Sequence, residues 1–153
     1  MKKINWKSLL INLLIPLLLG SIVGLISSDN SEYLNTLNRH IIIPNIVFPI
    51  VWTFLYLLVG FWAYLYEETY CFDNNTIGLY YLSLGVNLSF IPVLFLLHLK
   101  IFALVIVIFL LLLVLVLFYK SYKRKKVLGY ILIPYLLWII FALILMIDIV
   151  VSN

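Results

Sequence analysis

Five apolar stretches without a charged residue or a histidine limit most strongly how this chain can fold. Each is 19 to 21 residues long, and together they are residues 8–27, 46–66, 77–97, 101–119 and 127–147. An α-helix rises about 1.5 Å per residue, so each stretch makes a helix of about 30 Å, the thickness of the hydrocarbon core of a bilayer. The chain is therefore predicted to be an all-α integral membrane protein, a bundle of five transmembrane helices.

The composition leaves no room for a soluble domain beside these helices. Of the 153 residues, 66% are hydrophobic and only 10% are charged, and a soluble domain of this size cannot bury so much apolar surface. We therefore expect residues 1–153 to form a single membrane domain. The first stretch follows Lys2, Lys3 and Lys7, as a signal peptide would. It is longer than the apolar region of a typical signal and no small-residue cleavage motif follows it, so we expect it to be a retained helix.

Basic residues are distributed unequally between the two ends of the predicted bundle. Eight of the ten lie at the end that holds the N-terminus and the segments 67–76 and 120–126, and only Arg39 and Lys100 lie at the other end. Cytoplasmic loops are enriched in Lys and Arg. The N-terminus is therefore predicted to lie inside and the C-terminus outside, in what we expect to be a bacterial cytoplasmic membrane. The basic run at 120–126 is interpreted as a determinant of this topology, and no nucleic acid is expected as a partner.

The aromatic residues Trp6, Trp62 and Tyr66 lie at the ends of predicted spans near the basic side. Because Trp and Tyr are enriched where the membrane meets water, these three are predicted to form an interfacial belt.

The spans lack the groups that conventional catalysis and metal binding require. Cys71 is the only cysteine, the two histidines lie near predicted loops, and no carboxylate, Lys, Arg or His lies inside a span. No acid–base pair, nucleophile or metal cluster can be assembled from such residues. We therefore expect no conventional enzyme, no catalytic residue, no metal site and no required cofactor.

Aromatic and amide side chains recur at similar depths in three of the spans. Counted from the predicted outer end at the helical rise, Trp52 and Phe90 lie about 9 and 10 Å deep, and Trp138 and Asn87 about 14 and 15 Å deep. The sequence predicts that these groups converge on one cavity that opens toward the outer face, with the long connection 28–45 above it. A purely structural alternative, in which the rings serve only helix packing, stays open at this point.

Three segments carry a resemblance to a known family, "FPIVWTFLY" at 48–56, "LYYLSLGVNLSFIPVLF" at 79–95 and "LIPYLLWIIFA" at 132–142. They resemble the TspO/MBR family, which comprises the tryptophan-rich sensory proteins and the translocator protein, or peripheral-type benzodiazepine receptor. They occur in the family's order, in a chain of the family's length and number of spans. The resemblance implies a five-helix bundle, often a homodimer, with a pocket for protoporphyrin IX, haem and hydrophobic drugs.

The resemblance also implies a function and a set of binding residues. The function is that of a membrane receptor or carrier for porphyrins and similar hydrophobic ligands, in tetrapyrrole sensing, transport or disposal. The binding residues would be Trp52, Tyr56, Asn87, Phe90, Tyr135, Trp138 and Ala142.

The chain departs from the family pattern at several positions, and two other functions compete with ligand binding. Where the family has proline, tryptophan, glutamine, tryptophan and asparagine, this chain has Ile43, Ile46, Ser83, Phe90 and Met146. The first alternative function is light-dependent degradation of protoporphyrin IX, in which Trp52 and Trp138 would take part. The second is a structural role as a partner within a larger membrane complex.

Overall fold

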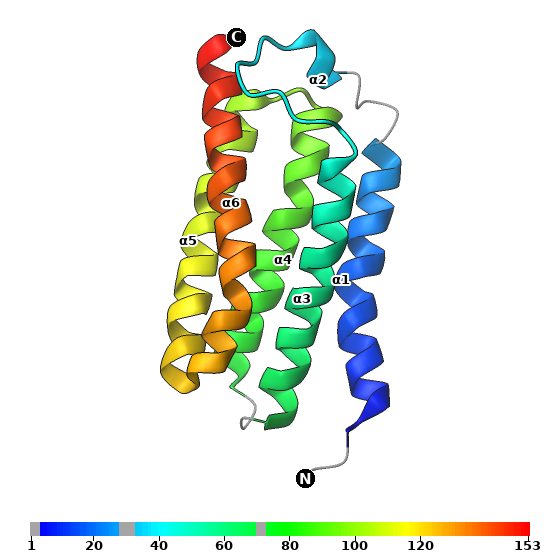
Figure 1. Cartoon of the computed structure of the whole chain (residues 1–153), viewed down its shortest axis with the longest axis vertical. Helices are drawn as coiled ribbons and strands as arrows, with labels where there is room; N and C mark the ends of the chain where they lie inside the picture. The colour runs from blue at the N-terminus through cyan, green and yellow to red at the C-terminus, as the bar shows by residue number, and fades with distance from the viewer. Residues whose placement is uncertain (1–3, 28–32, 70–72) are drawn as a thin grey trace.

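A computed structural model of the protein describes residues 4–27, 33–69 and 73–153, and all regular structure in these ranges is helical. The elements are α1 (Trp6–Ser27), α2 (Tyr33–Thr36), α3 (Val47–Thr69), α4 (Asn74–Phe95), α5 (Lys100–Arg124) and α6 (Lys126–Ser152) (Figure 1). All the helices except α2 are long and apolar enough to cross a membrane. The predicted fold class, a five-helix membrane bundle, is confirmed.

The last two helices extend beyond the charge-free stretches that predicted them. α5 continues through Lys123 and Arg124, and α6 continues past Asp148 to Ser152. A charged residue ends an apolar stretch but not a helix, because a long cationic side chain can extend toward water while its backbone stays helical. Cations in the last turn of α5 also interact favourably with the helix dipole.

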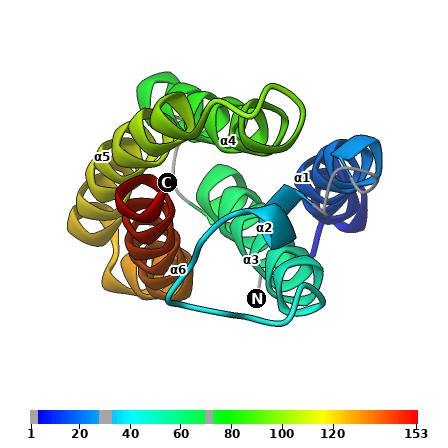
Figure 2. The same ribbon diagram turned by 90° about the horizontal axis from the view of Figure 1, so that it is seen from above.

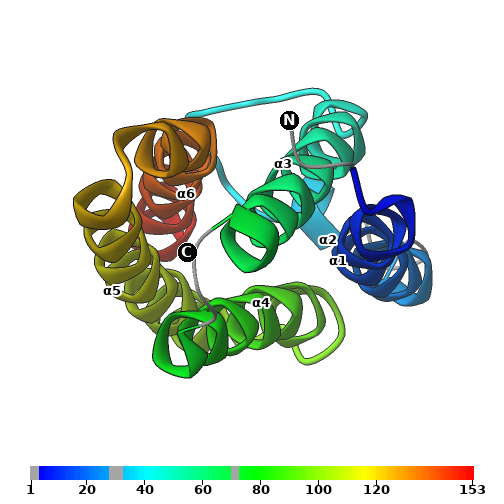
Figure 3. The same ribbon diagram turned by 90° about the horizontal axis from the view of Figure 1, so that it is seen from below.

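The five long helices form a closed ring. α1 packs against α3 and α4, α4 against α5, α5 against α6, and α6 against α3. Figures 2 and 3 show this ring from its two ends. α2 and the C-terminus lie at one end, which we call the C-terminal end, and the first turn of α1 lies at the other, the N-terminal end (Figure 1).

An aromatic cluster fills the interior toward the N-terminal end. Trp62 lies 5.1 Å from Tyr66 and 5.5 Å from Tyr80, measured between ring centroids, and all three side chains are buried. The prediction of an interfacial belt is therefore wrong for Trp62 and Tyr66. Both are close to the end of their helix, but they face the interior of the ring. Of the three predicted belt residues, only Trp6, which is 65% exposed, is placed as a belt residue would be.

The connection between α2 and α3 crosses the C-terminal end and is held there by the end of α6. The Asp148 carboxylate accepts hydrogen bonds from the backbone N–H groups of His40, at 2.9 Å, and Ile41, at 3.1 Å. Its other oxygen lies 2.9 Å from the His40 Nδ1. The Asn153 side chain adds two bonds to the backbone of Asn38. Residues 28–32 of the predicted covering connection lie outside the described residues, but the rest of it is anchored over the ring.

Candidate functional site

A cavity of about 690 Å³ opens inside the ring near its C-terminal end. Its walls come from α1, α3, α4 and α6, and residues 39–46 of the connection close part of its C-terminal end. Among the described residues, α5 contributes nothing to the lining. The cavity and the aromatic cluster around Trp62 therefore divide the interior, with open space toward one end and close packing toward the other.

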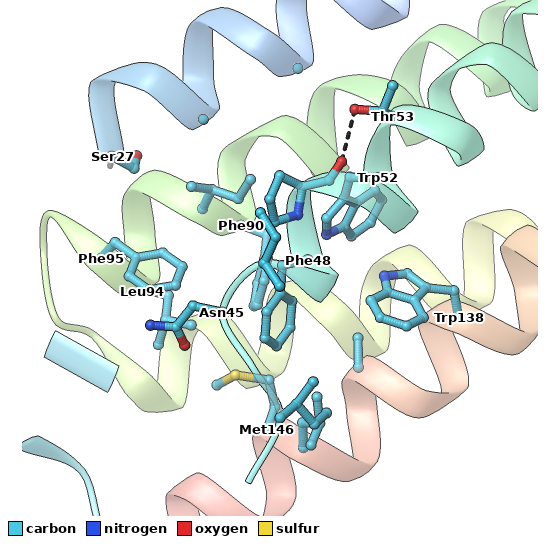
Figure 4. A pocket seen from close by; sticks show the side chains of 18 of the residues that line it. Ser27, Asn45, Phe48, Trp52, Thr53, Phe90, Leu94, Phe95, Trp138 and Met146 are labelled. Carbon is cyan, nitrogen blue, oxygen red and sulfur yellow. Dashed lines mark hydrogen bonds between the residues drawn. The ribbon is translucent and has the colours of Figure 1, made fainter. Parts of the chain in front are cut away.

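One face of α3 provides the aromatic wall of the cavity. Phe48, Trp52 and Tyr56 follow one another at four-residue spacing, so their side chains lie on one side of the helix, and all three line the cavity. Trp52 stacks on Tyr56 at 5.5 Å. From α6, the Trp138 ring approaches Trp52 edge-on at 6.4 Å and Phe48 at 6.2 Å. Figure 4 shows the two indoles next to each other, with Phe48 nearby.

The structure brings five of the seven predicted binding residues to this cavity. They come from three helices and are Trp52, Tyr56, Phe90, Trp138 and Ala142. Depth along the helix, from which the convergence of Trp52, Phe90 and Trp138 was predicted, was thus a useful guide to position.

The other two predicted binding residues, Asn87 and Tyr135, do not line the cavity. Both are buried, and the Asn87 Nδ2 donates a hydrogen bond of 3.2 Å to the Tyr135 hydroxyl. A buried amide needs a polar partner, and here a neighbouring helix supplies it. The pair therefore joins α4 to α6 within the core and leaves the cavity to other residues.

Four of the five departures from the family pattern lie at the cavity. Ile43, Ile46, Phe90 and Met146 all line it. Ser83 does not, and its hydroxyl donates to the Tyr80 carbonyl within α4. Four of the five departures therefore lie in the walls of the cavity.

Small residues of α1 form a part of the lining that the sequence analysis did not assign to the cavity. Gly20 and Gly24 line it together with Ser27. A Cβ atom at Gly20 would overlap the ring of Tyr56, so the glycine is what lets this ring lie against α1. The signal in the sequence was the motif "GSIVG" at 20–24, which is typical of close helix contact and gives no indication of a cavity.

The side of the cavity between α1 and α3 is not closed by the described part of the chain. Several residues line the cavity and are exposed on the surface of the bundle as well, namely Ser21, Gly24, Leu25, Ile46, Pro49 and Thr53. They belong to the halves of α1 and α3 near the C-terminal end and to the residue before α3. The cavity therefore opens sideways, toward the membrane region, as well as at its end.

Three buried polar atoms of the lining have no hydrogen-bond partner among the described residues. They are the Ser27 Oγ, the Tyr56 hydroxyl and the Trp138 Nε1. A buried polar atom without a partner costs free energy. Neighbouring protein atoms cover each of these atoms, so a ligand could bond them only after a small movement of the side chains around them.

The arrangement is suited to noncovalent binding of a flat apolar molecule. An apolar, aromatic cavity with few polar groups is the usual form of a small-molecule site. Within the described ranges, no group of three or more His, Cys, Asp and Glu side chains is placed to hold a metal ion.

Comparison with known proteins assigns nearly the whole chain to one family. The model of the TspO/MBR family matches residues 12–151, and this region includes every described residue that lines the cavity. A comparison with curated proteins gives no match.

Proposed function

Because the chain belongs to the TspO/MBR family, we propose that it is a membrane receptor or carrier that binds porphyrins such as protoporphyrin IX or haem. The observation that carries the proposal is the cavity, where two indoles and the rings of Phe48, Tyr56 and Phe90 line one space of about 690 Å³. Small-molecule sites range from about 300 to 1,000 Å³. A porphyrin is a flat apolar ring of the kind that stacks on aromatic side chains.

After a small movement of the side chains around them, the polar atoms of the lining would supply the few directed contacts that such a ligand needs. The Trp138 Nε1–H is a donor only, while the hydroxyls of Tyr56 and Ser27 can donate or accept. These groups would fix the orientation of a ring that the aromatic walls alone leave free to rotate in its own plane.

We further propose that the C-terminal end of the bundle faces the outside of a bacterial cell. The distribution of basic residues supports this orientation. The cavity would then open toward the outer face and, between α1 and α3, toward the surrounding lipid. A hydrophobic ligand would reach it from the membrane without passing through water.

A titration of the purified protein with protoporphyrin IX in detergent tests the proposal. Trp52→Phe and Trp138→Phe are expected to weaken binding by up to about 10-fold, because the smaller ring keeps part of the stacking and a whole aromatic pair contributes about 0.5 to 1.5 kcal/mol. Trp6→Phe is the matched control, because Trp6 is exposed at the N-terminal end, far from the cavity. It should bind as the wild type does.

The same samples separate the competing functions. If no porphyrin binds at micromolar concentration, the receptor proposal fails and a structural role within a larger complex becomes the better explanation. If binding occurs, illumination of the complexes tests degradation. Porphyrin absorbance should then fall faster in the wild type than in the two variants at the cavity.

A further inference from the structure

We propose that Arg39 makes this cavity selective for amphiphiles that carry an anionic group at one end of a flat apolar body. The inference rests on the proposed function and specifies the class of ligand. It starts from the two charged side chains of the described lining, Arg39 and Asp148, which differ in how fully they are bonded.

Asp148 is already occupied by the protein. One carboxylate oxygen accepts the backbone N–H groups of His40 and Ile41, and the other lies 2.9 Å from the His40 Nδ1. These bonds hold the connection in place over the ring. A cationic ligand would have to compete with them for this carboxylate.

Arg39 has no such partner. Among the described residues, its guanidinium takes part in no hydrogen bond or ion pair, and the side chain is half-buried at the cavity. A guanidinium carries a permanent charge and five N–H donors in a planar fork that fits a carboxylate. The charge that is free to meet a ligand is therefore positive.

One uncharged polar group of the lining is compatible with the same kind of ligand. The Trp138 Nε1–H can only donate, so a partner for it must be an acceptor. The buried hydroxyls of Tyr56 and Ser27 can donate or accept and therefore select neither kind of ligand.

The distance between these groups gives the ligand its shape. Arg39 is followed by His40, whose backbone N–H is hydrogen-bonded to Asp148. Asp148 lies ten residues beyond Trp138 on α6, or about 15 Å along the helix. The space between them is lined by Ala142, Leu145 and Met146. An apolar body of this length with an anionic edge satisfies both ends, whereas an uncharged body satisfies only the aromatic end.

Protoporphyrin IX and its dimethyl ester test the inference, because they share one ring and differ in whether two carboxylates are charged. Affinities of both are measured for the wild type, Arg39→Gln, Arg39→Lys and Lys100→Gln. Lys100 is the matched control, because it is a cation at the same end of the bundle that does not line the cavity. Partition of each ligand into protein-free micelles provides the baseline.

The measured quantity is the ratio of the dissociation constant of the ester to that of the acid. In the wild type this ratio should exceed the baseline about tenfold, as expected for a charge-assisted hydrogen bond. Arg39→Gln should return it to the baseline with little change in affinity for the ester. Arg39→Lys, which keeps the charge, should retain part of the preference, and Lys100→Gln should retain all of it.

Several results would overturn the inference. A wild-type ratio at the baseline, with both ligands bound, removes the selectivity and leaves the receptor proposal intact, and this comparison does not depend on any variant being folded. Equal loss of preference in Lys100→Gln and Arg39→Gln would assign the effect to the general positive field of this end. Failure of both ligands to bind would reject the proposed function itself.

Discussion

The crossing of α1 and α3 at Gly60 provides a sharp test of how the ring is packed. A Cβ atom at this position would overlap the backbone carbonyl oxygen of Asn12 and lie 2.9 Å from the Cα of Leu13. These are backbone atoms, so they cannot turn aside as the tip of a side chain can. A hydrogen bond of 3.0 Å from the Asn12 Nδ2 to Glu67 ties the same two helices together. In Gly60→Ala, therefore, α1 must move as a body and strain this bond.

The loss of stability expected for Gly60→Ala can be estimated by comparison with the same change at Gly85. Replacing a glycine by alanine in a helix interior gains about 1 kcal/mol from helix propensity. Forcing an extra methyl group into a packed interior costs about 1 to 3 kcal/mol. A methyl group added at Gly85 of α4 would meet no described atom of another helix within 4 Å, so Gly85→Ala gains the first quantity alone. The difference in unfolding free energy between the two variants therefore measures the cost of the extra methyl group at the crossing. It should be about 1 to 3 kcal/mol, with Gly60→Ala the less stable variant.

Unfolding in mixed micelles of a mild detergent and SDS, followed by far-UV circular dichroism, measures this difference. Gly85→Ala should unfold at a higher fraction of SDS than the wild type, and Gly60→Ala at a lower fraction than Gly85→Ala. Equal stability of the two alanine variants would refute the close approach of α1 and α3 at this crossing.

Two further predictions concern buried and anchoring hydrogen bonds. Tyr135→Phe should lower the unfolding free energy by about 0.5 to 2 kcal/mol, because it leaves the Asn87 amide without its partner. The double variant Tyr135→Phe/Asn87→Leu should lose less stability than the sum of the losses in the two single variants. Additive losses in this double-mutant cycle would contradict the pairing. Asp148→Ala should speed hydrogen exchange at the amides of His40 and Ile41 about tenfold or more, since hydrogen bonds to a charged group contribute about 1.5 to 3 kcal/mol. Unchanged exchange at these two amides would mean that the carboxylate does not anchor the connection.

The aromatic wall was predictable because helical periodicity and depth are both written in the sequence. Phe48, Trp52 and Tyr56 share a face by their spacing, and the predicted depths of Trp138 and Trp52 differ by only about 5 Å, roughly one helical turn. Depth does not give the rotation of a helix about its axis, however. Asn87 lies at the depth of Trp138 but meets Tyr135 instead, because the choice between cavity and core depends on which neighbouring helix presents a partner.

Other parts of the site give weaker signals. Gly20 and Gly24 contribute by the absence of a side chain, so their sequence pattern cannot distinguish helix contact from a cavity wall. Trp62 and Tyr66 were assigned to the membrane interface by their position in the span, yet the closed ring turns their face of α3 inward. Only the arrangement of all five helices decides these cases.

The connection before α3 is the least predictable part of the site, and it contributes the charged side chain of Arg39 to the lining of the cavity. Its residues follow no helical period, so nothing in the sequence alone places Arg39 at the cavity. Its position depends on Asp148, a residue more than a hundred positions later that fixes the backbone at His40 and Ile41. The helices supply an aromatic space that suits many flat molecules, whereas the anchored connection adds the one unbonded charge of the described lining. If Arg39 selects the ligand as proposed, relatives with the same helices and a different connection should share the aromatic cavity and differ in the charge of the ligand that they prefer.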